Sequence, residues 1–380
     1  MSEYQYYEFQ TADRRLSEKE MLELRAYSTR ARITPTSFVN EYSFGNFKGN
    51  ADAWMEKYFD GFLYLANWGT HILQLALPAK LLSATTARLY CATEVASVRE
   101  KSGRIILSFI SEDENGGDWV EGEGLLSSLM PLRADLARGD LRCLYLGWLL
   151  GVQNGGLDDD EAEPAVPPNL AELSGALSHF IDFLRIDPEL IAVAAQASPQ
   201  ARTPSANRQE MAAWVASLPT KEKDGLLVRL MDGGDMHIGA ELLSRFNRQR
   251  AARDPAAEPP RRTVAELLAA AEGQREAGRR EKARLADEER AHRERMAAVA
   301  REKHLDSVVT RVEEHWAEIE ALIATKQPKK YDLAVQHLVD LRDVAARQGN
   351  ESDFAGRLAL LRTRHVAKPS FTDRLSRNRL

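Results

Sequence analysis

The sequence feature that most constrains the fold is a proline-free stretch, residues 263–303, which is rich in alanine and in charged side chains. Strong helix formers over such a length predict one long helix. The segment before it, residues 251–262 (AARDPAAEPPRR), contains three prolines and is expected to be a linker. Because the 380-residue chain also exceeds the roughly 250–300 residues at which single cores stop growing, we expect several domains.

The long helix has two interpretations. A coiled-coil seam can be drawn from Val264 through Leu268 and Ala271, but it soon passes through polar residues such as Arg275 and Glu289. Coiled coils need apolar residues at these positions over three to four heptads. A single solvated helix, held by charge pairs four residues apart, is the other interpretation. A homodimer through the charged helix and a monomeric arm both remain open.

Residues 1–155 mix helix and strand signals, which predicts an α+β head domain. Ser17 and Glu20 form a capping box that opens a helix. The other predictions are a strand from Ile33 to Tyr42 that passes through Pro35, a strand pair at Phe62–Ala66 and His71–Leu77, a helix from Pro78 to Tyr90, and a hairpin of Ala92–Val98 with Arg104–Ile110.

Strand signals stop at Leu125, and an acidic, proline-containing loop follows near residue 160. Beyond this loop, apolar residues at helical spacing predict a helical domain over residues 169–250. Three further apolar stripes predict a C-terminal helical module at residues 304–380, in which two helices meet at Gly349 and look like one tetratricopeptide-like unit. Such a unit cannot bury its face alone, so it should dock on the helix of Trp316 or on a partner.

The charge is unevenly distributed along the chain. The net charge is −6, yet residues 261–380 carry 25 Lys/Arg and 20 Asp/Glu, a net charge of +5, which leaves −11 for residues 1–260. This balance argues against a protein that coats nucleic acid. Cys91 and Cys143 lie among apolar residues, which indicates two buried thiols in a reducing compartment. No signal peptide or membrane-spanning segment is recognisable, so we expect a cytoplasmic location.

The sequence contains no established catalytic signature. It has no Walker A motif, no HExxH, no GxSxG and no CxxC pair, and we therefore predict no catalytic residue and no cofactor. Three histidines lie near a glutamate at helical spacing: His292 with Glu289, His315 with Glu318, and His237 with Glu241. These pairs could bind a metal, but ordinary surface or core histidines are the simpler interpretation, so no metal site is predicted.

Two sets of residues are the candidate functional sites. In the head, polar and aromatic residues at strand ends could line a pocket or a docking surface, although they could equally be core and turn residues; the set is Thr34, Asn40, Asn67, Trp68 and His71. In the tail, the apolar stripes supply a partner-docking set, which is Trp316, Tyr331, Phe354, Leu358 and His365.

Several short segments carry a resemblance to a known family. They include Tyr7-Glu8-Phe9, Ile33-Thr34-Pro35-Thr36, Tyr58-Phe59-Asp60 and Leu65-Ala66-Asn67-Trp68-Gly69-Thr70, together with the tail pattern from Leu341 to Pro369. The chain resembles a family of uncharacterised bacterial proteins encoded beside SWIM-type zinc-finger proteins. The resemblance implies such a zinc-finger protein as a partner, and it supplies no activity and no catalytic residue.

Three functions follow as hypotheses. The first is a non-catalytic bacterial scaffold or interaction component of a multiprotein system, since a charged arm ends in a small helical module. The second is an enzyme with an unrecognised site in the head, around Asn40, Asn67, Trp68 and His71. The third is an accessory nucleic-acid binder that uses the basic tail, which the interleaved acidic residues disfavour.

Overall fold

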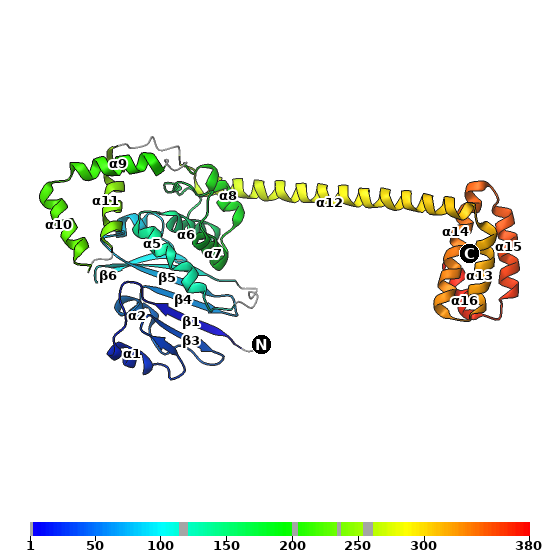
Figure 1. Cartoon of the computed structure of the whole chain (residues 1–380), viewed down its shortest axis with the longest axis horizontal. Helices are drawn as coiled ribbons and strands as arrows, with labels where there is room; N and C mark the ends of the chain where they lie inside the picture. The colour runs from blue at the N-terminus through cyan, green and yellow to red at the C-terminus, as the bar shows by residue number, and fades with distance from the viewer. Residues whose placement is uncertain (1–2, 114–120, 200–203, 234–236, 254–260) are drawn as a thin grey trace. The chain divides into compact units, whose positions relative to one another are not determined.

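The structure is a computed structural model, and it describes residues 3–113, 121–199, 204–233, 237–253 and 261–380. The chain folds into two compact units, Met1–Ala277 and Gly278–Leu380. The first contains an antiparallel sheet with covering helices, and the second is helical in its described residues (Figure 1). An α+β region followed by a helical region agrees with the predicted fold class. Most of the predicted linker, residues 254–260, lies outside the described residues.

The sheet has seven strands in the order β2-β3-β1-β4-β5-β7-β6, and every neighbouring pair is antiparallel. The strands are β1 (Gln5–Gln10), β2 (Arg32–Thr34), β3 (Ser37–Tyr42), β4 (Gly61–Ala66), β5 (His71–Pro78), β6 (Ala96–Lys101) and β7 (Arg104–Ser111). The predicted hairpin of β6 and β7 is confirmed, with Lys101 paired to Arg104 across a turn in which Ser102 and Gly103 have φ of 52° and 76°. Positive φ at both positions is typical of a two-residue hairpin turn.

Two sequence predictions about prolines were wrong. The segment Ile33–Tyr42 is not one strand, because Thr34 pairs with Ser37 and Pro35 lies in the turn between β2 and β3. Proline has no N–H to donate and its fixed φ suits a tight turn. The helix expected from Pro78 is also shorter, since Pro78 is the last residue of β5 and α3 spans only Ala84–Arg88. Ser83 caps that helix by accepting a hydrogen bond from the Thr86 N–H.

Successive side chains along a strand point to opposite faces of the sheet. Every residue of the central strand β4 is buried, so both faces are covered there. Along β4, Leu63 and Leu65 face one hydrophobic cluster, whereas Phe62 and Tyr64 face another. The second face is covered by α1 (Glu18–Arg25) and α2 (Ala51–Lys57), and the predicted capping box of α1 is confirmed. The first face is covered by α4 to α7, and α8 packs on α6 in the same core; Figure 1 labels α5, α6 and α7 beside the sheet. These helices are α4 (Leu125–Leu129), α5 (Pro131–Ala137), α6 (Arg142–Gln153), α7 (Gly175–Leu184) and α8 (Pro188–Gln196).

The cluster on the first face continues beyond the predicted head. It contains residues from the sheet, from α6 and also Leu170 and Phe180, which lie within the region predicted as a separate helical domain. The predicted boundary between 155 and 169 therefore lies inside a continuous core. Three more helices complete this unit, α9 (Pro204–Ser217), α10 (Thr220–Met231) and α11 (Ile238–Arg253), and they share a small cluster around Trp214, Leu218 and Phe246.

The start of α12 (Val264–Val309) is anchored in the first unit. Val264, Leu267 and Ala271 are buried in its core. Just before them, Arg262 donates hydrogen bonds of 2.8 and 2.7 Å to the buried carboxylate of Glu163. Beyond Ala277 the helix carries exposed ion pairs between neighbouring turns, such as Arg290 with Asp287 at 2.8 Å. Whether this stretch is a solvated arm or pairs as a coiled coil stays a prediction.

The second unit has its own hydrophobic core. The end of α12 contributes Leu305 and Val308, and four more helices supply the rest: α13 (Val312–Ala324), α14 (Pro328–Gln348), α15 (Glu351–Arg364) and α16 (Pro369–Arg377). Helix α14 packs against α13, α15 and α16. It ends at Gly349, whose φ of 70° is the left-handed conformation typical of a helix C-cap. The tetratricopeptide-like character of this unit stays a prediction.

Candidate interaction surfaces and side-chain clusters

His71 is the most enclosed of the five head residues predicted as a site. Its Nδ1 lies 2.6 Å from the Phe183 carbonyl oxygen, so Nδ1 carries the proton and Nε2 accepts from Arg185 Nη2 at 3.1 Å. The ring also stacks on Phe183 with centroids 4.7 Å apart. Burial lowers the pKa of His71 from its ordinary value. Both ring nitrogens therefore hold α7 against the start of β5.

The other four head residues are dispersed along the sheet. Asn40 is buried and donates to Ser28 Oγ at 3.0 Å, and Asn67 Oδ1 accepts from the Tyr4 N–H at 3.0 Å. Trp68 is partly exposed in the turn between β4 and β5. Thr34 lies at the opposite end of the sheet from this turn, since β3 pairs Ser37 with Gln10 and the far end of β1 pairs with Ala66. The register does not bring the five residues into one group.

The predicted tail residues belong mainly to the core of the second unit. Trp316, Tyr331 and Phe354 are buried there, and Leu358 packs against the same cluster. The Trp316 and Phe354 ring centroids are 5.9 Å apart. His365 Nε2 lies 2.7 Å from Glu320 Oε2, which ties α15 to α13. Most of these side chains therefore stabilise their own unit, and the α14–α15 pair docks on the helix of Trp316, one of the two arrangements expected from the sequence.

A groove of about 330 Å³ lies between α13 and α15 in the second unit. Arg357 crosses it, donates to both carboxylate oxygens of Glu313 at 2.6 and 2.9 Å, and places its guanidinium 4.6 Å from the centroid of the Trp316 ring. The hydrogen bonds from Arg357 lower the pKa of Glu313. Arg364 also pairs with an acid, and its Nη1 lies 2.5 Å from Glu320 Oε1. Because both arginines that line it are paired with acids, the groove offers no strong net charge to a ligand.

A different surface, on α10 of the first unit, is strongly apolar. Leu227, Val228, Leu230 and Met231 are between 56% and 84% exposed, and no residue of α10 is buried. We call these four residues the α10 ridge. Leu226, which lies one turn before Leu230 at the edge of the ridge, packs on the small cluster with Trp214 and Phe246. Contiguous exposed apolar surface is unusual in soluble proteins and marks interaction sites.

The sequence held a signal for the α10 ridge that periodicity alone did not reveal. Leu226, Leu227 and Leu230 lie within the helical domain predicted at residues 169–250. At 100° per residue, the apolar residues from Leu226 to Met231 span roughly 200° of the helix circumference. A helix that packs on one side can bury only part of such an arc, and the remainder stays exposed.

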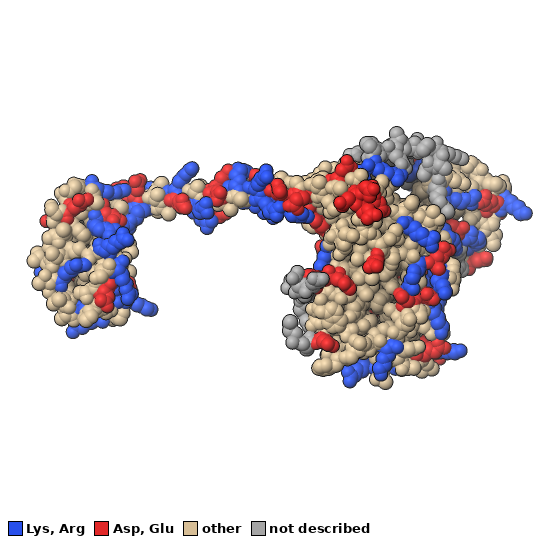
Figure 2. Space-filling model, turned by 180° about the vertical axis from the view of Figure 1, so that it is seen from behind, with Lys and Arg blue, Asp and Glu red and all other residues tan. Residues whose placement is uncertain are grey.

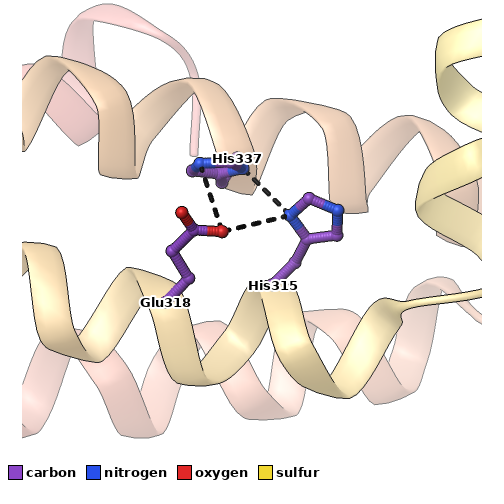
Figure 3. A group of neighbouring side chains, drawn as sticks. All are labelled: His315, Glu318 and His337. Carbon is purple, nitrogen blue, oxygen red and sulfur yellow. Dashed lines mark hydrogen bonds and ion pairs between the residues drawn. The ribbon is translucent and has the colours of Figure 1, made fainter.

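One group of potential metal ligands is present among the described residues. His315 and Glu318 lie on α13, and His337 lies on α14 and points toward them (Figure 3). Their ligand atoms all lie within 4.8 Å of one another. The sequence had singled out His315 and Glu318 by spacing, but His337 is distant in sequence and only the packing of α13 on α14 brings it close.

Comparisons of the chain with protein-family models, with curated proteins and with solved structures return no match. The family resemblance and the zinc-finger partner it implies therefore stay predictions. Among the described helices, none is both long enough and apolar enough to cross a bilayer.

Proposed function

We propose that this protein is a non-catalytic interaction or scaffold component of a multiprotein system, and that it binds another protein through the α10 ridge. The exposure of Leu227, Val228, Leu230 and Met231 is the observation that carries this proposal. Fully burying a side chain of this size is worth about 1.5–3 kcal/mol, so four of them can support an interface after the cost of association is met.

The surroundings of the α10 ridge suit a protein partner. The same helix carries Lys221, Asp224 and Asp232 as exposed charges. An apolar centre with a polar rim is the usual anatomy of a protein–protein interface. The occupant that fits is the apolar face of an amphipathic helix on another protein, for which a SWIM-type zinc-finger protein remains the candidate implied by the family resemblance.

The alternative functions receive less support. Enzymatic activity in the head would need free polar groups in a common pocket, whereas both His71 nitrogens are engaged by Phe183 and Arg185. For nucleic-acid binding, Figure 2 shows acidic and basic side chains interspersed along α12 on the face in view. A mixed field of this kind attracts phosphate weakly. The charged arm of the first hypothesis, on α12, would present the second unit to a further partner, and its pairing as a homodimer stays a prediction.

The test uses the full-length protein with a photoreactive p-benzoylphenylalanine in place of Met231. Irradiation in an extract of the native cells should give one discrete adduct, whose partner is identified by mass spectrometry and then purified. With that purified partner, Leu227→Lys and Met231→Lys should each weaken binding at least 10-fold, because a charge replaces an apolar contact at the interface centre. Calorimetric titration measures the affinity.

The matched control is Leu22→Lys, which changes an equally exposed leucine on α1 and should leave binding unchanged. Circular dichroism should show that all three variants fold, since the altered side chains are exposed. An adduct that contains only a second copy of this chain would replace the proposed partner with a homodimer. Equal binding by the ridge variants and the parent protein would refute the proposal.

A further inference from the structure

We infer that His315, Glu318 and His337 form a binding site for a divalent transition-metal ion, for which Zn²⁺ is the best fit. Two imidazole nitrogens and one carboxylate oxygen are the donor set that zinc accepts readily. Magnesium and calcium prefer sites made of oxygen ligands alone. Metal binding at this cluster would require no protein partner, so it is independent of the α10 ridge.

The distances between the three side chains suit a shared ion (Figure 3). His315 Nδ1 lies 3.0 Å from His337 Nδ1, and Glu318 Oε2 lies 4.0 Å from His315 Nδ1 and 3.8 Å from His337 Nε2. Ligand atoms around a tetrahedral zinc ion are about 3.4 Å apart, given Zn–N bonds of about 2.05 Å. Only one nitrogen of His337 can bind a shared ion, so either its distance to His315 or its distance to Glu318 would change as the ring turns. One ligand atom from each residue already lies within 4.8 Å of the other two, and side-chain rotations would bring all three to the ion.

The backbone places the ligands on two packed elements. His315 and Glu318 are three residues apart, which puts both side chains on one face of α13. His337 reaches the same point from α14, which packs along α13. Sites built on helices hold their geometry better than sites on loops. An ion at this position would join α13 to α14.

The site is shielded on its imidazole side and open on its carboxylate side. The side chains of His315 and His337 are 15% and 23% exposed, whereas that of Glu318 is 56% exposed. Burial and the neighbouring His337 lower the pKa of His315, which favours the neutral imidazole that binds metals. Arg311 also faces His315, but its guanidinium is 2.8 Å from Glu314.

A hydrogen bond between the two histidines explains why their rings approach so closely. One Nδ1 must donate a proton to the other across 3.0 Å, so the histidines share a hydrogen bond between unlike tautomers. For both Nδ1 atoms to bind an ion, the donating histidine would move this proton to its own Nε2 and remain neutral. Three protein ligands leave the fourth position of a tetrahedral zinc for water or for a side chain of a bound protein.

The experiment is a zinc titration of the full-length, chelator-treated protein at pH 7.5 against a chromophoric chelator. We expect one ion per chain with a dissociation constant in the micromolar range or below. Glu318→Gln should weaken binding at least about 10-fold and His337→Ala about 100-fold, since even changes outside the ligand shell cost 10–100-fold at metal sites. Cobalt in place of zinc should give the intense visible absorption of a tetrahedral site, lost in His337→Ala.

The matched control is His292→Ala on α12, because Glu289 and His292 repeat the same three-residue spacing in exposed positions. This variant should bind zinc as the parent does. Glu318→Gln preserves the size of a largely exposed side chain, so its folding is not at risk, and circular dichroism checks His337→Ala. Zinc binding only at millimolar concentration, or affinity unchanged in both ligand variants, would reduce the cluster to a hydrogen-bonded histidine pair.

Discussion

The buried carboxylate of Asp340 illustrates how much can depend on a single residue. Its side chain on α14 is 3% exposed and accepts a hydrogen bond of 2.7 Å from His304 and another from Arg301, both on α12. Burial opposes ionisation of this carboxyl, but the hydrogen bonds from His304 and Arg301 outweigh it and lower its pKa. Sequence reasoning could not find this contact, because its members are separated by more than 30 residues.

Replacing Asp340 should destabilise the second unit in a pH-dependent way. A lowered folded-state pKa means that the carboxylate contributes its stability above the ordinary value of 3.8, and that this contribution is lost as the pH falls through the folded-state pKa. Asp340→Asn should therefore lower the free energy of unfolding by roughly 1–3 kcal/mol at pH 6–7, because the buried site loses its charge-assisted hydrogen bonds with Arg301 and His304. Below the folded-state pKa of Asp340, which is lower than 3.8, the variant and the parent should converge.

Chemical unfolding of the full chain at several pH values measures this difference. The control is Asp332→Asn, which removes an exposed partner of Arg374 and should cost less than about 1 kcal/mol at every pH. A deficit for Asp340→Asn that does not shrink at all as the pH falls below 3.8 would show that packing, rather than charge, explains the loss.

At the scale of elements, the sequence predicts helix starts and turns best, because residues close together in the chain determine them. The Ser17 capping box and the hairpin of β6 with β7 depend on local sequence, and the structure contains both, although β6 spans Ala96–Lys101 and not the predicted Ala92–Val98. Pro35 and Pro78 were misplaced because a proline is compatible with a strand end, a turn and a helix start, and the neighbouring strands decide among them. The head candidates were polar and aromatic residues at strand ends, and the tail candidates came from the apolar stripes. Several of them are packing residues, since His71 stacks on Phe183 and the Trp316 ring packs against that of Phe354.

Substituting alanine for each of two helical glycines should change the free energy of unfolding in opposite directions. A Cβ added to Gly147 on α6 would lie 2.4 Å from the buried ring of Phe109, whereas one added to Gly225 on α10 would meet no atom within 4 Å. Gly147→Ala should therefore destabilise the first unit by about 1–3 kcal/mol through overpacking. Gly225→Ala should stabilise it by up to about 1 kcal/mol through helix propensity. Urea unfolding midpoints give both values, and a stabilising Gly147→Ala would contradict the close packing of α6 on β7.

At the scale of the molecule, the two units have hydrophobic cores that share no residue. The domain boundaries predicted near residues 155 and 250 relied on loops and prolines, which show where the chain leaves an element. They cannot show which elements share a core, because that depends on contacts such as Phe180 with Phe109, whose ring centroids are 5.0 Å apart.

Separate cores predict separate unfolding. Trp316→Ala should destabilise the second unit by about 3–5 kcal/mol, since it empties a buried site in that core. Hydrogen exchange of the full chain, followed by mass spectrometry, should then show lost protection in peptides from 312–380 and unchanged protection in peptides from 1–199. Leu333→Ala, at an exposed position on α14, should leave both sets unchanged. Equal loss of protection in both units would show that they unfold together.

The strand order of the sheet also affects how the chain can fold while it is being synthesised. Most strands pair with strands that are synthesised before them. When β3 is complete it can pair with β1 and β2, β4 can then pair with β1, and β5 with β4. The sheet can therefore grow strand by strand as the chain leaves the ribosome, where domains form in the order of synthesis. The helices α4 to α8 follow all seven strands, so the face they cover stays bare until they emerge. While that apolar face is uncovered, we expect the nascent chain to be prone to aggregation and to be a substrate for ribosome-associated chaperones.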